Sequence, residues 1–196
     1  YVNKNSISLN STITQSIFET NSFLLNEKNR KNGIHLNEYA AFFGSIQIFT
    51  YLKNEGVKLN SSLWYYAIHG ENSAIIHLLE DNHVIAKTAV LKGNYEVESF
   101  EGCFKESIKC HHNEIANFLL NNYMTDLDEN SDKTFTHSLA YYNFSFLKNE
   151  KLNESSFCQL CHYDYYPFVK ILLTRKDINI NDKEITIIEI QNHIFE

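Results

Sequence analysis

The stretch LNEYAAFFGSIQIFTYLKNEGVKLN, residues 36–60, decides the fold class of this chain. Its apolar residues recur at helical spacing on both sides of Gly44, which predicts two short helices joined by a tight turn. The small residues Ala40 and Ala41 allow the two helices to approach closely. Gly44 permits a backbone conformation that a side chain would penalise, and Gly56 is placed to end the second helix. The stretch therefore predicts a helix–turn–helix unit followed by a loop.

Similar segments recur along the chain. They are residues 67–79 (AIHGENSAIIHLL), 107–120 (SIKCHHNEIANFLL), 160–173 (LCHYDYYPFVKILL) and a weaker, shorter unit at 138–147 (SLAYYNFSFL). We matched the first small or apolar position of each unit, namely Ala40, Ala67, Ser107, Leu139 and Leu160. The spacings between them are 27, 40, 32 and 21 residues. This irregular period predicts an array with deletions and insertions between its units.

The units resemble the ankyrin-repeat family. Residues 40–49, AAFFGSIQIF, align without a gap to the ankyrin consensus A-A-x-x-G-H-x-E-I-V, and His112, Glu114 and Ile115 keep its H-x-E-I core. Residues 39–49 and 63–69 resemble, more narrowly, a protist family of divergent ankyrin proteins of unknown function. The T-P-L-H start of an ordinary ankyrin helix is absent from every unit. The resemblance implies an all-α fold, an ankyrin-like helical-repeat solenoid of stacked antiparallel helix pairs with irregular repeat lengths.

The boundaries of the array follow from these matches. We expect about five divergent ankyrin-like repeats over residues 36–182. Residues 1–35 are predicted to form N-terminal capping helices, because the end of an array must cover its last hydrophobic face. Residues 183–196 are interpreted as the start of a truncated further repeat. The two longest connections, residues 85–102 and the acidic residues 126–132, are predicted to be surface loops.

The composition excludes two classes of function. A net charge of −7 and an isoelectric point of about 5.7 argue against a sequence-independent DNA or RNA binder, which needs excess Lys and Arg to displace counterions. No stretch approaches the roughly 20 apolar residues of a membrane-spanning helix, and the first residues lack the apolar core of a signal peptide. We therefore expect no nucleic-acid partner, no membrane insertion and an intracellular, cytoplasmic protein, which the four cysteines also fit.

Two cysteine motifs could carry chemistry. Residues 158–162, CQLCH, match the C-x-x-C-H string of covalent haem attachment. We favour core packing instead, because Leu160 and Cys161 fall at the small, buried positions of a repeat helix. Cys110, His111 and His112, with Cys103 seven residues upstream, have zinc-ligand chemistry. We favour the interpretation that the two histidines form a turn that braces neighbouring loops, as the ankyrin resemblance implies. We predict no cofactor and no metal site.

The sequence contains no common catalytic motif. It lacks G-x-x-x-x-G-K-[ST], G-x-G-x-x-G after a strand, H-E-x-x-H and G-x-S-x-G. Its carboxylates have the spacing of solvated helix faces. We therefore predict that the chain is not an enzyme.

A binding surface is the favoured functional prediction. In ankyrin-like stacks, the two residues after the small pair of each first helix face the groove, and such aromatic positions are frequent interface anchors. The predicted row consists of Phe42, Phe43, His69, Lys109, Tyr141, Tyr142, His162 and Tyr163. A less specific interpretation is that half of these side chains fill gaps between repeats. The pattern indicates no particular oligomeric state.

Two functions follow from this surface. The favoured one is a noncatalytic protein–protein interaction scaffold that binds a protein or peptide through the inner-helix groove. Because the chain starts at Tyr1 rather than Met, we also expect a piece of a longer protein. The alternative function is therefore a recognition module of a larger protein with a catalytic or membrane domain elsewhere.

Overall fold

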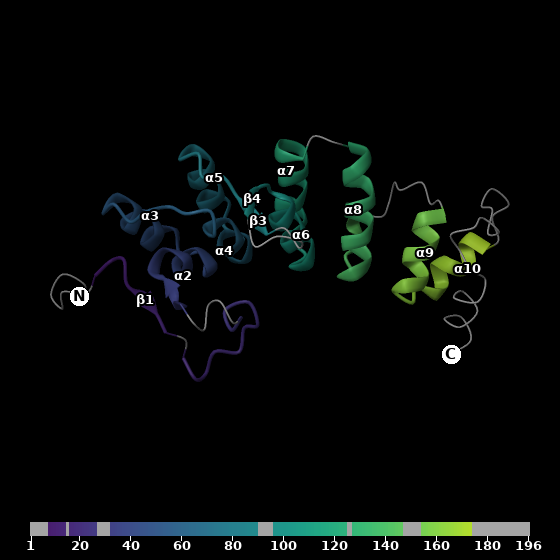
Figure 1. Cartoon of the computed structure of the whole chain (residues 1–196). Helices are drawn as coiled ribbons and strands as arrows, with labels where there is room; N and C mark the ends of the chain where they lie inside the picture. The colour runs from purple at the N-terminus through teal and green to yellow at the C-terminus, as the bar shows by residue number, and fades with distance from the viewer. Residues whose placement is uncertain are drawn as a thin grey trace. The chain divides into compact units, whose positions relative to one another are not determined.

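The computed structural model describes residues 8–14, 16–26, 32–89, 96–124, 127–146 and 154–173. These residues are mostly helical, in agreement with the predicted all-α class, and they also contain two short strand pairs. None of the helices in these ranges is long and apolar enough to cross a membrane. The chain divides into two compact units, residues 1–119 and 120–196, and each is described by itself (Figure 1).

Three consecutive helix pairs begin in the first unit. They are α2 (Leu36–Phe42) with α3 (Ile46–Asn54), α4 (Leu63–Gly70) with α5 (Ser73–Asp81), and α6 (Glu101–Lys109) with α7 (Asn113–Tyr123). The first helix of each pair contacts the first helix of the next pair: α2 packs on α4, and α4 packs on α6. Apolar residues at helical spacing give each of these helices a buried face.

Trp64 on α4 is the largest fully buried side chain in the described part of the chain. Its indole Nε1 donates a hydrogen bond to the carbonyl oxygen of Val84 at 2.6 Å. Trp64 packs edge-to-face on Phe100, with the two ring centroids 4.9 Å apart. Other fully buried side chains of α3 to α7 are Phe49, Leu63, Ile68, Ile75, Leu79, Phe104, Ile108 and Leu119. Trp64 therefore ties α4 to the connection that follows α5.

The turn inside each helix pair has a left-handed residue. These residues are Gly44 (φ 61°), Glu71 (φ 48°) and His111 (φ 61°). The N–H of Ser45 donates to the carbonyl of Ala40 at 2.8 Å, and the N–H of His112 donates to that of Ser107 at 3.0 Å. These bonds are the six-residue closure of a Schellman helix ending. The predicted helix–turn–helix unit is therefore present, although only its first copy uses glycine at the turn.

Neighbouring turns are joined by the residue that follows each left-handed position. Asn72 Nδ2 donates to the carbonyl oxygen of Gly44 at 2.9 Å. One pair further along, His112 Nδ1 lies 3.0 Å from Glu71 Oε1. In both cases the side chain reaches back to the left-handed residue of the preceding pair. The bracing role predicted for the histidine turn is confirmed for His112.

The prediction of capping helices at residues 1–35 is tested only over the described part of that segment. The described residues 8–14 and 16–26 form turns and the two-residue strand β1 (Thr12–Ile13). This strand pairs antiparallel with β2 (Ile34–His35), which directly precedes α2. No capping helix lies within these two ranges. The remaining residues up to 31 lie outside the described ranges and Asn32 is helical, so the prediction of capping helices stays a prediction for the segment as a whole.

Side chains explain why the N-terminal segment turns. Asn21 Oδ1 accepts hydrogen bonds from the N–H groups of Phe23 at 2.9 Å and Leu24 at 3.3 Å. Ser16 Oγ accepts a hydrogen bond from the N–H of Phe18 at 3.2 Å. Short polar side chains that capture nearby backbone donors compete with helical hydrogen bonds. The apolar pattern of this segment suggested helices, but its Asn and Ser residues favour turns.

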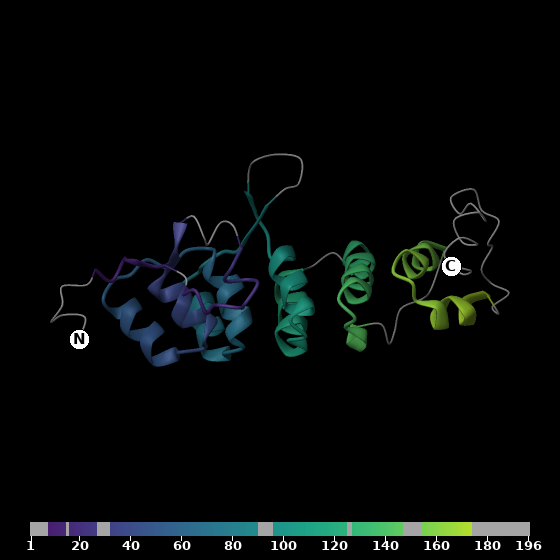
Figure 2. The same cartoon turned by 90° about the horizontal axis from the view of Figure 1, so that it is seen from below.

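Both of the connections predicted to be loops contain regular structure. Within residues 85–102, strands β3 (Lys87–Ala89) and β4 (Glu96–Glu98) pair antiparallel, and Figure 2 shows them extending away from the helices. Within residues 126–132, helix α8 already begins at Leu127. Acidic sequences are favoured at helix starts because the helix dipole is positive there, a factor that the loop prediction left out.

The second unit contains α8 (Leu127–Ala140), the short 3-10 helix η2 (Phe144–Phe146), α9 (Glu154–His162) and α10 (Tyr166–Leu173). Its core consists of Phe135, Leu139, Phe157, Leu160, Tyr165 and Val169, with Cys161 and Tyr163 packed against it. The hydroxyl of Tyr165 donates to the carbonyl oxygen of Leu139 at 2.8 Å and so links the turn after α9 to α8. The truncated repeat predicted at 183–196 lies outside the described residues.

The turns of the second unit correct the register of the segment predicted at residues 138–147. Tyr142 (φ 56°) and Asp164 (φ 57°) are the left-handed residues. The N–H of Asn143 donates to Ser138 at 2.9 Å, whereas the predicted match was Leu139. Ser138 is therefore the residue equivalent to Ala40. The spacings on either side of it become 31 and 22 residues instead of 32 and 21.

Candidate functional site

Four residues of the predicted row lie in the first unit, at the ends of α2, α4 and α6. Phe43 is 54% exposed, Phe42 and His69 are partly buried, and Lys109 is exposed. The ring centroids of Phe42 and Phe43 lie 5.0 Å apart, and those of Phe42 and His69 lie 5.3 Å apart. The structure therefore brings Phe42, Phe43 and His69 together. Lys109 joins them only indirectly, through Glu106.

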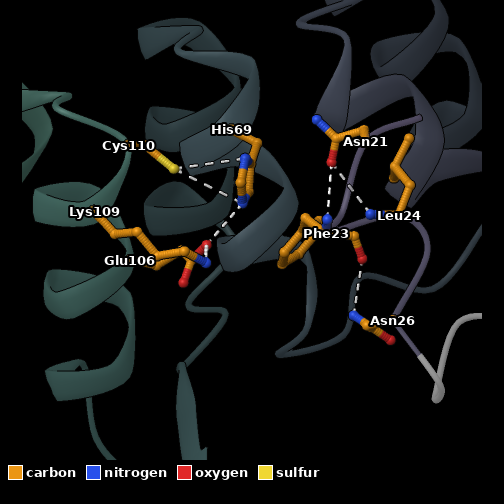
Figure 3. A network of polar contacts seen from close by, with 8 residues as sticks. All are labelled: Asn21, Phe23, Leu24, Asn26, His69, Glu106, Lys109 and Cys110. Atoms are coloured by element: carbon orange, nitrogen blue, oxygen red, sulfur yellow. Dashed lines mark hydrogen bonds and ion pairs between the residues drawn. The ribbon is translucent and has the colours of Figure 1, made fainter. Parts of the chain in front are cut away.

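A side chain from outside the helix pairs covers part of this row. The ring centroid of Phe23 lies 4.1 Å from that of His69, 5.1 Å from that of Tyr66 and 6.0 Å from that of Phe42. Figure 3 shows Phe23 beside His69. Sequence reasoning missed this contact because it assigned residues 1–35 to a cap at the end of the array. The apolar run that begins at Phe23, in a polar segment, was the available signal.

A cavity of about 380 Å³ lies between the N-terminal segment and the first helices. Phe23, Tyr65 and Tyr66 are among the residues that line it, and so is Glu38, which is only 6% exposed. One carboxylate oxygen of Glu38 accepts from the N–H of His35 at 2.9 Å, and the other accepts from the hydroxyl of Ser62. Since this buried carboxylate is already hydrogen-bonded, the cavity offers aromatic surface rather than a free charge.

His69 and Glu106 form a polar contact between α4 and α6. His69 Nε2 lies 3.0 Å from Glu106 Oε1, and Lys109 Nζ lies 2.9 Å from the same oxygen. The side chains of His69 and Glu106 are 13% and 14% exposed. Burial alone would raise the pKa of Glu106, but the hydrogen bonds and charges of His69 and Lys109 outweigh it. The pKa of Glu106 therefore lies below its ordinary value.

Cys110 completes this cluster. Its Sγ lies 3.6 Å from His69 Nδ1 and 3.9 Å from His69 Nε2. Dashed lines mark both contacts in Figure 3. Burial, and secondarily the negative charge of Glu106, raises the pKa of the Cys110 thiol to about 11. The order of Cys110, His69 and Glu106 superficially matches a nucleophile, its base and an orienting acid. A thiol that stays protonated at neutral pH is a poor nucleophile, so this geometry does not favour thiol catalysis.

The structure rearranges the metal-ligand candidates that the sequence suggested. Cys103 is fully buried within α6, His111 is exposed in the turn, and His112 is paired with Glu71. Cys110 instead joins His69 and Glu106, which no sequence motif linked to it. In the described part of the chain, these three residues are the one group of three or more His, Cys, Asp or Glu side chains that could hold a metal ion.

The other four row residues lie in the second unit. His162 is exposed, Tyr141 is partly buried, and Tyr163 packs against the core. Tyr142 is 67% exposed, but its left-handed φ places it in the turn and not on the helix. A shift of one residue rotates a side chain by about 100° around a helix. The positions equivalent to Phe42 and Phe43 are therefore Ala140 and Tyr141, which corrects the assignment of Tyr142 to the row.

The C-x-x-C-H string lies at the end of α9. Leu160 is buried and Cys161 packs against the core of the second unit, as the packing interpretation expected. Cys158 and His162 are exposed instead. The core-packing interpretation therefore holds for Cys161 and not for Cys158.

Exposure predicts the order in which the cysteines react. Cys158 should react first with a thiol reagent, whereas fully buried Cys103 should react at least about a hundredfold more slowly, because it requires opening of the fold. The check is timed alkylation followed by mass spectrometry of the peptides. The substitution Cys158→Ser should remove the fastest phase. A fast phase that persists in this variant would contradict the assigned exposure.

Comparison with protein-family models, with curated proteins and with solved structures gives no match to this chain. The ankyrin resemblance therefore remains a prediction.

Proposed function

We propose that this chain is an ankyrin-like helical-repeat solenoid that acts as a noncatalytic scaffold for a protein or peptide partner. The recurring helix pairs support the repeat interpretation. Left-handed turn residues occur at the same place in each pair, and the side chains of Asn72 and His112 connect successive turns in the same way. A repeated connection of this kind is expected when each unit contacts mainly its neighbours.

The observation that carries the binding proposal is the position of Phe23. An irregular segment of the same chain places an aromatic ring against Phe42, Tyr66 and His69. This face therefore accepts a nonhelical segment through aromatic contacts, which is the interaction that a peptide partner would make. Aromatic residues on rigid helices bury much area at a small cost in entropy.

Phe43 is the row residue that this contact leaves most available in the first unit. It is 54% exposed although it lies beside the rings of Tyr39 and Phe42. The net charge of −7 favours a protein over a nucleic acid as the partner. The four free cysteines support an intracellular location.

A matched pair of substitutions tests the proposed face. Phe43→Ala should reduce the amount of a captured partner at least about tenfold, because loss of an interface hot spot costs about 2 kcal/mol or more. Ile48→Ala is the control, since Ile48 is equally exposed, at 57%, but lies on the second helix α3. The measurement is quantitative mass spectrometry of proteins captured by wild type and both variants, with circular dichroism to verify folding.

The comparison between variants decides the outcome. Proteins that Ile48→Ala retains and Phe43→Ala loses are the partners that the proposal expects. If Phe43→Ala retains every protein that wild type captures, or if both variants lose the same proteins, the first-helix face is not the binding surface.

A further inference from the structure

Three side chains of different chemistry converge between α4 and α6. His69 lies in the last turn of α4, Glu106 lies on α6, and Cys110 is the residue directly after α6. Their ligand atoms all lie within 4.8 Å of one another. Figure 3 shows the three side chains in the space between the two helices.

We propose that His69, Glu106 and Cys110 form a zinc-binding site that joins the second helix pair to the third. Imidazole nitrogen, carboxylate oxygen and thiolate sulfur are the three ligand types of protein zinc sites. The mixed set distinguishes this site from a calcium or magnesium site, for which oxygen ligands are preferred. This inference shares His69 with the proposed partner surface, but neither its evidence nor its test depends on a partner.

The distances from His69 Nε2 to the other two ligand atoms are close to those of tetrahedral zinc coordination. Metal–ligand bonds of about 2.3 Å to sulfur and about 2.0–2.1 Å to nitrogen and oxygen place sulfur and nitrogen about 3.6 Å apart, and nitrogen and oxygen about 3.3 Å apart. His69 Nε2 lies 3.9 Å from Cys110 Sγ and 3.0 Å from Glu106 Oε1. Both distances lie within a few tenths of an ångström of these values, and a rotation of the Cys110 side chain would bring its sulfur, already within 4.8 Å of the Glu106 carboxylate, to the metal.

Local structure explains why the three ligands meet. Glu106 lies on α6 and Cys110 directly follows it. Because the two residues are four positions apart, their side chains lie on the same face. That face packs on α4, where His69 lies one residue before the helix ends. No fourth His, Cys, Asp or Glu of the described residues joins the group. A water molecule would complete the tetrahedron.

The protons on His69 and Cys110 would be arranged differently in the metal-free and the zinc-bound site. With zinc absent, Nε2–H of His69 donates to the carboxylate of Glu106, and the thiol of Cys110 stays protonated. Zinc binding would release the thiol proton to solvent and place the imidazole proton on Nδ1, since a metal ligand must offer a lone pair. Metal affinity therefore carries the cost of removing one proton from sulfur.

Lys109 would compete with zinc for the carboxylate of Glu106. Its ammonium lies 2.9 Å from the Glu106 oxygen that zinc would use, and its side chain is 44% exposed. Because the ammonium end of this ion pair is exposed to solvent, the pair contributes little to stability and zinc can displace it at small cost. The substitution Lys109→Gln should tighten zinc binding by a few-fold, an effect that a site elsewhere on the chain would not show.

The test is metal binding by the full chain after removal of metal with a chelator. Zinc titration against a chromophoric chelator should give one ion per chain. Cobalt(II), used as a spectroscopic substitute, should produce a thiolate-to-cobalt charge-transfer band. Cys110→Ser should abolish the band and weaken zinc binding at least about a hundredfold, because loss of outer-shell partners alone costs 10–100-fold. His69→Gln should weaken zinc binding similarly.

The matched control is Cys158→Ser, which removes an exposed thiol of the second unit. It should leave the stoichiometry and the cobalt band unchanged. Circular dichroism verifies that each variant is folded. The proposal is overturned if wild type binds no zinc at one per chain, if the cobalt band persists in Cys110→Ser, or if Cys158→Ser removes it.

Discussion

Replacing Trp64 by alanine is expected to lower the free energy of unfolding by about 3–5 kcal/mol, the cost of removing a large buried aromatic side chain. Trp64 has no exposed surface, packs on Phe100 and donates to the carbonyl of Val84. The loss is a large part of the roughly 5–15 kcal/mol that holds a small domain folded. Unfolding by urea is measured by circular dichroism and not by tryptophan fluorescence, because Trp64 is the chain's one tryptophan and the substitution removes it.

A milder substitution keeps this prediction testable if the alanine variant does not fold. Trp64→Phe retains an aromatic ring at the site but leaves the carbonyl of Val84 without its donor. We expect a loss of about 1–3 kcal/mol, the cost of a partly buried acceptor without this partner together with reduced packing. A loss below about 1 kcal/mol for the alanine variant would show that Trp64 is not the centre of the core.

Gly70→Ala is expected to have the second large effect, a net loss of about 2–3 kcal/mol from overpacking. A Cβ atom on Gly70 would lie 2.1 Å from the carbonyl oxygen of Ala41 and 2.9 Å from the backbone nitrogen of Gly44. Both atoms belong to the backbone at the end of α2, so no side chain can rotate away. The helix propensity of alanine, worth about 1 kcal/mol over glycine, offsets only part of the strain.

Gly56→Ala is the matched control for this effect. Its φ of 85° penalises a side chain, but a Cβ atom there would meet nothing within 4 Å. We expect a loss of about 1–2 kcal/mol from the backbone conformation alone. Denaturation of both variants checks the prediction. Equal losses, or a neutral Gly70→Ala variant, would contradict the close approach of α2 and α4.

The helix pairs could be predicted because their signals are local. Apolar residues repeat with the helical period, and Gly44 and Gly56 mark two of the turns by their conformational freedom. Glu71, His111, Tyr142 and Asp164 adopt the same left-handed conformation without glycine. Their sequence gives no such mark, and the register of the repeat at Ser138 was therefore shifted by one residue.

The candidate site could be predicted only in part, because its contacts join distant positions. The ends of the first helices were expected to carry the row, and Phe42, Phe43 and His69 do lie together. Phe23 was missed because no periodicity places a turn segment against a helix face. Cys110 was considered with its sequence neighbours, although its contact in the fold is His69, 41 residues away.

The sequence by itself determined the elements that depend on neighbours along the chain: the helix periods, the glycine turns and the acidic composition. Tertiary structure alone decided which residues from different pairs meet. Glu106 and Cys110 share a helix face by their spacing, but their approach to His69 depends on how α6 packs on α4. That packing is fixed by the shapes of buried side chains such as Trp64 and by the missing side chain of Gly70, which act across the core and not along the chain.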